Sequence, residues 1–216
     1  MVESRLALLA MLAEKSFRLG QFTLSSGQTS DYYVDCRATT LFAEGARLTG
    51  RVFFDEVLRR GWMPEAIGGM SLGADPIVVA VAMLSAQQVQ ARNAPPGVAG
   101  ADHPIHGFLV RPKEKMHGTR QRIEGYRQKG ARVIIVDDVC TTGRSTVDAI
   151  AAAREFGFEV IGVMCLVERL EAGGRVNVEQ AAAPAPFVAI FTSADVREEY
   201  LRLQRVAHAP PVKTME

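Results

Sequence analysis

The sequence predicts an α/β fold in which a mainly parallel, twisted sheet is flanked by helices. Short apolar runs rich in β-branched residues recur along the chain, and helical patterns separate most of them. These runs lie at 66–69, 108–110, 132–136, 159–167 and 187–191. Such runs are typical of strands buried on both faces, and their alternation with helices is typical of a parallel sheet. At 216 residues the chain is expected to form one domain, residues 1–216.

The first part of the chain, about residues 1–40, is expected to form a helix and a small cap outside the sheet. Leucines at near-helical spacing predict an amphipathic helix over residues 3–19. From Phe22 to Arg37 the pattern becomes strand-like around a Ser-Ser-Gly turn. This pattern predicts a hairpin or hood that stands apart from the main sheet.

The core of the domain is expected to span about residues 41–208. Its first helix runs from Thr40 to Arg60, and Gly61 can cap its end. A second helix, ending near Leu84, follows the first predicted strand of the sheet. The polar stretch 85–104 contains two consecutive prolines and is expected to be an exposed connection.

The C-terminal third repeats the strand and helix pattern. A helix is predicted from Val147 to Phe156, and the stretch between the last two strands is interrupted by glycines and prolines. A final helix is expected to end near Val206 and the tail, residues 209–216, to fray. The N-cap of that final helix is Thr192, Ser193 or Asp195.

Composition and charge limit the function classes that the sequence allows. The net charge is +1, so no global field calls for nucleic acid or an anionic membrane. No stretch approaches 18 consecutive apolar residues, and Glu3 stands where a signal peptide would carry basic residues. Three scattered cysteines (Cys36, Cys140 and Cys165) match no metal-binding spacing and are expected to be reduced. We expect a cytoplasmic protein with no membrane or nucleic-acid partner.

The segment from Arg132 to Ala149 carries the main functional signal. Its strand leads to two adjacent carboxylates, Asp137 and Asp138, which can hold a diol or a metal ion bound to the same ligand. A turn rich in hydroxyl groups, Thr141–Ser145, then precedes a helix. Such a turn aims N–H groups at one point, and the helix N-terminus adds partial positive charge, so a phosphate is suited to it. The alternative is an ordinary strand–turn–helix with a capping hydroxyl and a solvated acid pair.

Three further segments follow predicted strands. The glycine-rich segment Gly68–Gly73 is a second candidate phosphate loop or merely a tight connection. From Arg111 to Arg132 there are eight lysines and arginines against two glutamates, so a mobile anion-binding lid or a solvated basic face is expected over Arg111–Gly130. Glu168 and Arg169 end a third strand. Because ligands bind beyond the carboxyl ends of parallel strands, all these segments are expected to face one crevice.

Four segments together resemble the orotate phosphoribosyltransferase family of type I phosphoribosyltransferases. They are FTLSSGQTSDYYVD (Phe22–Asp35), RPKEKMHG (Arg111–Gly118), VDDVCTTGRS (Val136–Ser145) and VER (Val167–Arg169), with further matches at IEG (Ile123–Gly125) and GGMSLGADP. The resemblance covers nearly the whole chain. It implies the type I phosphoribosyltransferase fold with an N-terminal hood. It also implies Mg²⁺-dependent transfer of the phosphoribosyl group from phosphoribosyl pyrophosphate to N1 of orotate, in pyrimidine biosynthesis.

The resemblance also implies roles for individual residues. The catalytic residues implied are Lys115, His117, Asp137 and Asp138. The further substrate-binding residues implied are Ser25, Tyr32, Tyr33, Arg111, Pro112, Lys113, Val139, Cys140, Thr141, Thr142, Gly143, Arg144, Ser145 and Arg169. No residue is assigned as a direct metal ligand, since Mg²⁺ is expected mainly through the pyrophosphate. A homodimer is implied, in which loop 111–125 reaches the neighbouring site.

Two departures from the family pattern and two rival functions qualify this interpretation. Ser25 stands where many relatives carry lysine, and Pro112 stands in the loop where lysine is usual, with Lys113 displaced by one position. Proline has no N–H and a fixed φ, so the anion contacts of this loop cannot copy those of the family. One rival is a type I phosphoribosyltransferase for another base, such as a purine. The other is a regulator that keeps the fold and binds nucleic acid, against which the near-zero net charge counts.

Overall fold

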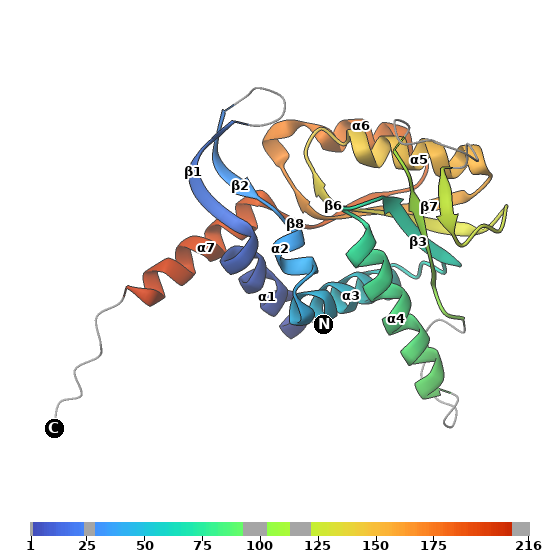
Figure 1. Cartoon of the computed structure of the whole chain (residues 1–216), viewed down its shortest axis with the longest axis horizontal. Helices are drawn as coiled ribbons and strands as arrows, with labels where there is room; N and C mark the ends of the chain where they lie inside the picture. The colour runs from blue at the N-terminus through green and yellow to red at the C-terminus, as the bar shows by residue number, and fades with distance from the viewer. Residues whose placement is uncertain (1, 24–28, 93–102, 113–121, 209–216) are drawn as a thin grey trace.

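The computed structural model describes residues 2–23, 29–92, 103–112 and 122–208 and places six strands in one sheet (Figure 1). They are β3 (Ala66–Met70), β4 (His106–Val110), β5 (Ile123–Gly125), β6 (Arg132–Cys140), β7 (Glu159–Glu168) and β8 (Phe187–Thr192). The spatial order is β5-β4-β3-β6-β7-β8, and every pairing is parallel except that of β4 with β5. The predicted α/β class with a mainly parallel sheet is confirmed.

Helices cover both faces of the sheet, as Figure 1 shows. On one face lie α1 (Val2–Met11), α3 (Ala43–Arg59), α4 (Asp75–Arg92) and α7 (Ser193–Ala207), and on the other α5 (Arg144–Phe156) and α6 (Gly174–Ala182). Consecutive residues of β6 serve the two faces, since Ile134 packs in the first apolar cluster and Ile135 in the second. Burial on both faces explains the unbroken apolar run of this strand.

The N-terminal segment forms the predicted hood. Its elements are a π-helical turn (Leu12–Ser16), β1 (Phe17–Thr23), β2 (Thr29–Val34) and the short helix α2 (Arg37–Thr40). The two strands pair antiparallel and project beyond the main sheet in Figure 1. The helix predicted over residues 3–19 is shorter in the structure, because Phe17 pairs with Val34 and its ring stacks on Tyr32 at 5.3 Å between centroids.

One other predicted boundary is wrong, and two elements of the structure were not predicted. Helix α4 continues to Arg92, beyond the predicted end at Leu84, through a stretch of alanine and glutamine that favours helix. Helix α6 forms where an irregular stretch was expected, and its Val178 is fully buried. Strand β5 lies inside the segment predicted as a loop over Arg111–Gly130, because Ile123 is buried and its strand pairs with β4.

The helix ends follow the sequence signals. Gly157 directly follows α5 with a φ of 104°, and Gly61 follows Arg60, the C-cap of α3, with a φ of 65°, which suits a glycine at a helix C-terminus. Thr192 is the N-cap of α7, and Asp195 completes a capping box with it. None of the helices in the described residues is both long and apolar enough to cross a membrane.

Candidate active site

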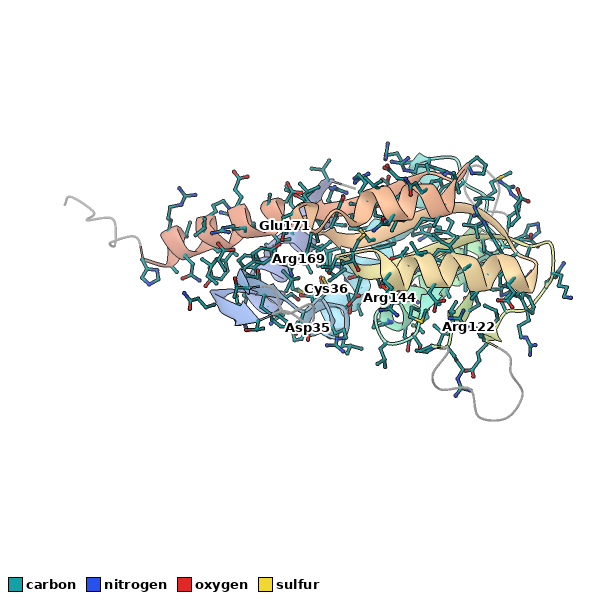
Figure 2. All side chains as sticks on the ribbon, turned by 90° about the horizontal axis from the view of Figure 1, so that it is seen from above. Asp35, Cys36, Arg122, Arg144, Arg169 and Glu171 are labelled. Atoms are coloured by element: carbon teal, nitrogen blue, oxygen red, sulfur yellow. The ribbon has the colours of Figure 1, made fainter. Side chains whose placement is uncertain are left out.

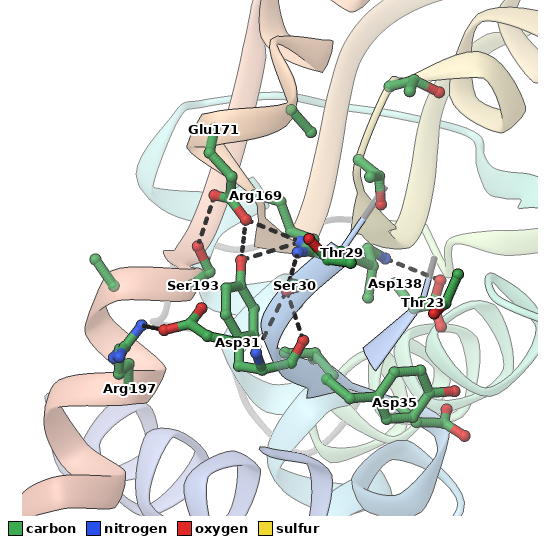
Figure 3. Close-up of a pocket in the computed structure, with 18 of the residues that line it drawn as sticks. Thr23, Thr29, Ser30, Asp31, Asp35, Asp138, Arg169, Glu171, Ser193 and Arg197 are labelled. Atoms are coloured by element: carbon green, nitrogen blue, oxygen red, sulfur yellow. Dashed lines mark hydrogen bonds and ion pairs between the residues drawn. The ribbon is translucent and has the colours of Figure 1, made fainter. Parts of the chain in front are cut away.

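A cavity of about 1040 Å³ lies between the hood and the carboxyl edge of the sheet (Figure 3). Its lining includes residues that follow four different strands: Gly73 after β3, Thr141 after β6, Arg169 after β7 and Ser193 after β8. The expected convergence of strand ends on one crevice is therefore confirmed for the first three. Arg111 follows β4 but is not among the described residues that line the cavity.

The acid pair lies inside β6, which continues to Cys140, and not beyond the strand as predicted. Asp137 is buried, and its Oδ2 accepts hydrogen bonds from Ser145 Oγ at 2.7 Å and from Thr146 Oγ1 at 2.8 Å. Its Oδ1 accepts the N–H of Asp138 at 3.0 Å. Asp137 thus fastens the end of β6 to the first turn of α5.

Asp138 is the member of the pair that lines the cavity. Gly73 lets the turn after β3 approach it closely, since a Cβ there would lie 2.5 Å from Asp138 Oδ1. Burial and the negative charge of Asp137 raise the pKa of Asp138 to about 6. The carboxylate therefore carries a desolvated negative charge that a hydroxyl group or a cation from a ligand can satisfy.

This raised pKa predicts a specific pH dependence of stability. Between pH 3.8 and about 6 the folded protein keeps a proton on Asp138 that the unfolded chain has lost. The contribution of Asp138 to stability is therefore fully present below pH 3.8 and is lost as the pH rises through about 6. We expect the melting temperature of the native chain, minus that of Asp138→Asn, to fall across this window in thermal melts. A difference that rises with pH would contradict the assignment.

The turn that precedes α5 has the shape expected of a phosphate loop. Gly143 has φ 75° and accepts the N–H of Val147 at 2.8 Å, so the first N–H groups of α5 have no intrahelical acceptor. Helix α6 braces the turn, because Asn177 Nδ2 donates to the carbonyl oxygen of Thr142 at 3.0 Å. A Cβ on Gly174 would lie 2.2 Å from the carbonyl oxygen of Thr141, so the two segments are in close contact.

Replacing Gly143 with alanine is expected to distort this turn. The new Cβ would meet Val178 Cγ2 at 2.6 Å in a left-handed backbone with φ 75°. Left-handed strain costs about 1–3 kcal/mol, and steric overlap adds to it, so thermal melting should occur roughly 3–10 °C lower. Gly130→Ala is the control, since φ is 79° there and nothing lies within 4 Å of the added Cβ. Equal losses in the two variants would mean that contact with α6 is unimportant.

A polar cluster around Arg169 forms another part of the cavity wall (Figure 3). Arg169 is buried, with Nε donating to Tyr32 Oη at 3.0 Å and to Glu171 Oε1 at 3.1 Å, and Nη2 donating to Ser30 Oγ at 3.0 Å. Tyr32 Oη donates to Glu171, and Ser193 Oγ donates to the other Glu171 oxygen at 3.4 Å. Nη1 of Arg169 makes no hydrogen bond to any described residue, so a ligand can use it.

Protonation states in this wall are well defined at neutral pH. Burial and the hydrogen bond to Glu171 raise the pKa of Tyr32 above its usual value. Burial alone would raise the pKa of Glu171, but hydrogen bonds from Tyr32 and Arg169 outweigh it, and the net effect is a lowered pKa. A neutral phenol and a charged carboxylate therefore hold the guanidinium in place. A guanidinium fixed in this way suits a planar molecule that presents paired oxygen atoms.

The remaining predicted site residues are found in different places. Tyr33, Val139 and Thr142 also line the cavity. Cys140 is buried in the apolar cluster beneath α5. Arg144 is exposed and contributes to a shallow groove between α5 and α6 (labelled in Figure 2).

The basic segment after β4 is described only at its two ends. Arg111 forms an ion pair with Glu124 at 3.0 Å, and Pro112 follows it directly. Arg122 bonds to Asp148 of α5, and Figure 2 shows it apart from the cluster around Arg169. Four predicted site residues lie outside the described residues: Ser25, Lys113, Lys115 and His117.

Several residues of the cavity were not predicted from the sequence. Glu171 and Ser193 belong to the wall around Arg169, and Asp35 and Arg37 lie at the base of the hood. The sequence held two signals for these residues. Glu171 lies two positions after Arg169, and Asp35 and Arg37 belong to an Asp-Cys-Arg triplet at the end of the hairpin. Both signals were weak, because the place of these residues in the cavity depends on how the hood meets the loops after β6 and β7, which are far from it in the sequence.

Comparisons with known proteins agree with this geometry. A family model described as phosphoribosyl transferase domain matches residues 110–179. The orotate phosphoribosyltransferase of Rhodopirellula baltica is 39% identical over 177 residues, which cover 80% of this chain and 85% of that protein. That of Aquifex aeolicus is 42% identical over 163 residues, covering 76% of this chain and 80% of that protein.

Solved structures show the same similarity. The orotate phosphoribosyltransferase of Mycobacterium tuberculosis in complex with Fe(III) dicitrate has a TM-score of 0.70 and 34% identity, covering 89% of this chain and 98% of that chain. The same enzyme in complex with 5-phospho-α-D-ribosyl 1-diphosphate has a TM-score of 0.67 and 31% identity, covering 90% and 99%. The chain therefore belongs to the orotate phosphoribosyltransferase family.

Proposed function

We propose that this chain transfers the phosphoribosyl group from phosphoribosyl pyrophosphate to N1 of orotate, giving orotidine 5′-monophosphate and pyrophosphate. The observation that carries the proposal is the arrangement of one cavity. Asp138, the start of the turn before α5 (Thr141 and Thr142) and the wall that contains Arg169 all line it, so a sugar, its phosphate and a planar base each have a matching surface. Relatives named for this activity align over most of the chain.

The turn at 141–145 would take the 5-phosphate of the sugar through the N–H groups at the start of α5. The Asp138 carboxylate would then accept hydrogen bonds from the ribose hydroxyls. Asp137 accepts hydrogen bonds from Ser145 and Thr146, and these bonds fix strand β6, which carries Asp138, against the start of α5. As the C1–oxygen bond breaks, positive charge grows on the ribose. A preorganised negative charge in a dry site stabilises that change.

Arg169 would bind the oxygen-rich edge of orotate. Its Nε is bonded to Tyr32 and Glu171 and its Nη2 to Ser30, so Nη1 is left for the substrate. Charge-assisted hydrogen bonds from a planar guanidinium to paired oxygens fix the ring orientation. This contact favours an anionic pyrimidine over a neutral purine.

The basic loop would act on the departing pyrophosphate. Lys115, His117 and Arg111 carry the positive charge that the family resemblance assigns to this step, and Lys113 is the candidate replacement for the lysine displaced by Pro112. Cations at the leaving group stabilise its developing negative charge, and a closed loop excludes water that would hydrolyse the sugar cation.

We also propose a homodimer in which loop 111–125 reaches the neighbouring site. Sedimentation analysis tests whether the protein is a dimer.

Magnesium is the expected cofactor, and the residues of the cavity fit one mode of binding it. No cluster of three metal-ligating side chains occurs among the residues that the structure describes. Asp138 offers one carboxylate to the cavity, whereas both oxygens of Asp137 already accept hydrogen bonds. One carboxylate combined with substrate phosphates is a usual way for proteins to hold Mg²⁺. The ion would neutralise charge on the pyrophosphate.

The three cysteines are buried and free, which fits a reducing compartment. We therefore propose that the protein is located in the cytoplasm.

The activity test is release of pyrophosphate from phosphoribosyl pyrophosphate and Mg²⁺ in the presence of different bases. We expect release with orotate and at least about 100-fold slower release with uracil, adenine or hypoxanthine, since these lack the carboxylate that Arg169 binds. Faster release with a purine would favour the rival phosphoribosyltransferase. Absence of release with every base, from a folded protein, would favour a regulator.

A further inference from the structure

We propose that Arg37, at the base of the hood, is a binding residue for the diphosphate group of the sugar substrate. The inference rests on the proposed function for the identity of the ligand. Its structural basis is a separate feature of the cavity: an exposed guanidinium that lines it together with Asp138 and Gly73.

Arg37 begins helix α2, and the chain there is fixed to the core. Cys36 is fully buried, and the N–H of Asp35 donates to the carbonyl oxygen of Ser16 at 3.0 Å. Asp35 in turn accepts Arg37 Nε at 2.9 Å and Arg37 Nη2 at 3.1 Å. Two bonds to one carboxylate fix the plane of a guanidinium, so Arg37 is already oriented before any ligand binds.

One edge of this guanidinium remains available. Nη1 of Arg37 makes no hydrogen bond to the described part of the chain, and the side chain is 46% exposed while it lines the cavity. The charge of Arg37 acts on Asp138, lowering the pKa of that carboxyl against the larger effect of burial. Because Arg37 and Asp138 line the same cavity, the free N–H groups face the space in which the sugar is proposed to bind.

The other arginines that line the cavity are engaged elsewhere. Arg169 is buried in the wall with Tyr32 and Glu171, and Arg197 of α7 pairs with Asp31 at 2.7 Å. In Figure 3, Asp35 lies on the opposite side of the view from Glu171, so the Arg37 end is distinct from the base-binding wall. A pyrophosphate group needs several donors, and a preoriented guanidinium beside the sugar site supplies two.

The test is the affinity for inorganic pyrophosphate with Mg²⁺, measured by isothermal titration without orotate. Arg37→Gln should weaken binding about tenfold or more, because hydrogen bonds from a charged group to an anion are lost. It should also raise the KM for phosphoribosyl pyrophosphate while leaving the KM for orotate unchanged. Arg37→Lys should recover part of the affinity, since it restores the charge but not the planar fork.

The matched control is Arg47→Gln. Arg47 makes the same two-bond contact with Glu44, at 2.8 and 2.6 Å, on an exposed part of α3 outside the cavity. Unchanged pyrophosphate binding in Arg37→Gln would overturn the inference and leave the proposed function standing. Equal weakening in both variants would also overturn it. Weakened pyrophosphate binding in Arg37→Gln alone, together with a native protein inactive toward orotate, would support the anion site and refute the function.

Discussion

Asp138→Asn is expected to abolish most turnover and at the same time to make the unliganded protein more stable. The carboxylate is desolvated beside Asp137, and its pKa of about 6 means that its charge destabilises the fold at pH 8. Removing that charge should stabilise the protein by about 2–3 kcal/mol, since each pKa unit corresponds to about 1.4 kcal/mol. The same charge would stabilise the sugar cation, so kcat should fall about 100-fold or more.

Asp137→Asn is the matched variant for this prediction. Both oxygens of Asp137 accept hydrogen bonds, and an amide leaves one of the donors without an acceptor. Burial also raises the pKa of Asp137, so loss of its charge offsets part of this cost, and the stability of Asp137→Asn should lie below that of Asp138→Asn. Chemical denaturation at pH 8 and pyrophosphate release measure the two effects. Near-normal turnover in both variants would remove the acid pair from the mechanism.

Arg169→Ala is expected to raise the KM for orotate by at least about 30-fold and to leave that for phosphoribosyl pyrophosphate nearly unchanged. Arg169 is buried and held by Tyr32, Glu171 and Ser30, so it is preorganised for one ligand edge. Truncating one partner of a buried charged contact costs about 2–5 kcal/mol. Initial-rate kinetics with each substrate varied in turn separate the two constants.

Two further variants make this result specific. Arg169→Lys keeps the charge but loses the planar fork, and its KM for orotate should still be about tenfold raised. Arg197→Ala removes a cavity arginine whose partner, Asp31, is 65% exposed, so it should change either KM less than about threefold. If Arg169→Ala raised the KM for both substrates equally, the role of Arg169 would be to maintain the shape of the whole cavity, which would contradict a specific contact with orotate.

The sequence predicts the central elements of the fold well because their signals are local. Strands β6, β7 and β8 are continuous apolar runs, and Gly157 marks the end of α5 by its backbone conformation. The elements missed depend on distant contacts. Strand β5 has three residues and exists through its pairing with β4. Helix α6 has little sequence signal and is held by packing of Val178 beneath α5.

The residues of the candidate site likewise fall into those that local sequence predicts and those that depend on distant contacts. The acid pair and the hydroxyl-rich turn were predictable because the apolar run 132–136, the two aspartates and residues 141–145 follow one another closely in the chain. Arg37 and Glu171 were not, since their place in the cavity depends on how the hood meets the loops after β6 and β7. The burial of Asp137 against Thr146 is likewise a property of packing, which residue order does not reveal.

The arrangement of three ligand surfaces around one cavity is tested most directly by a crystal structure with orotidine 5′-monophosphate bound. We expect the phosphate on the N–H groups of residues 141–145, the ribose hydroxyls on Asp138 and the pyrimidine carboxylate or a ring carbonyl on Arg169. A nucleotide bound with its phosphate at Arg169, or outside the cavity that Asp138 lines, would contradict the account.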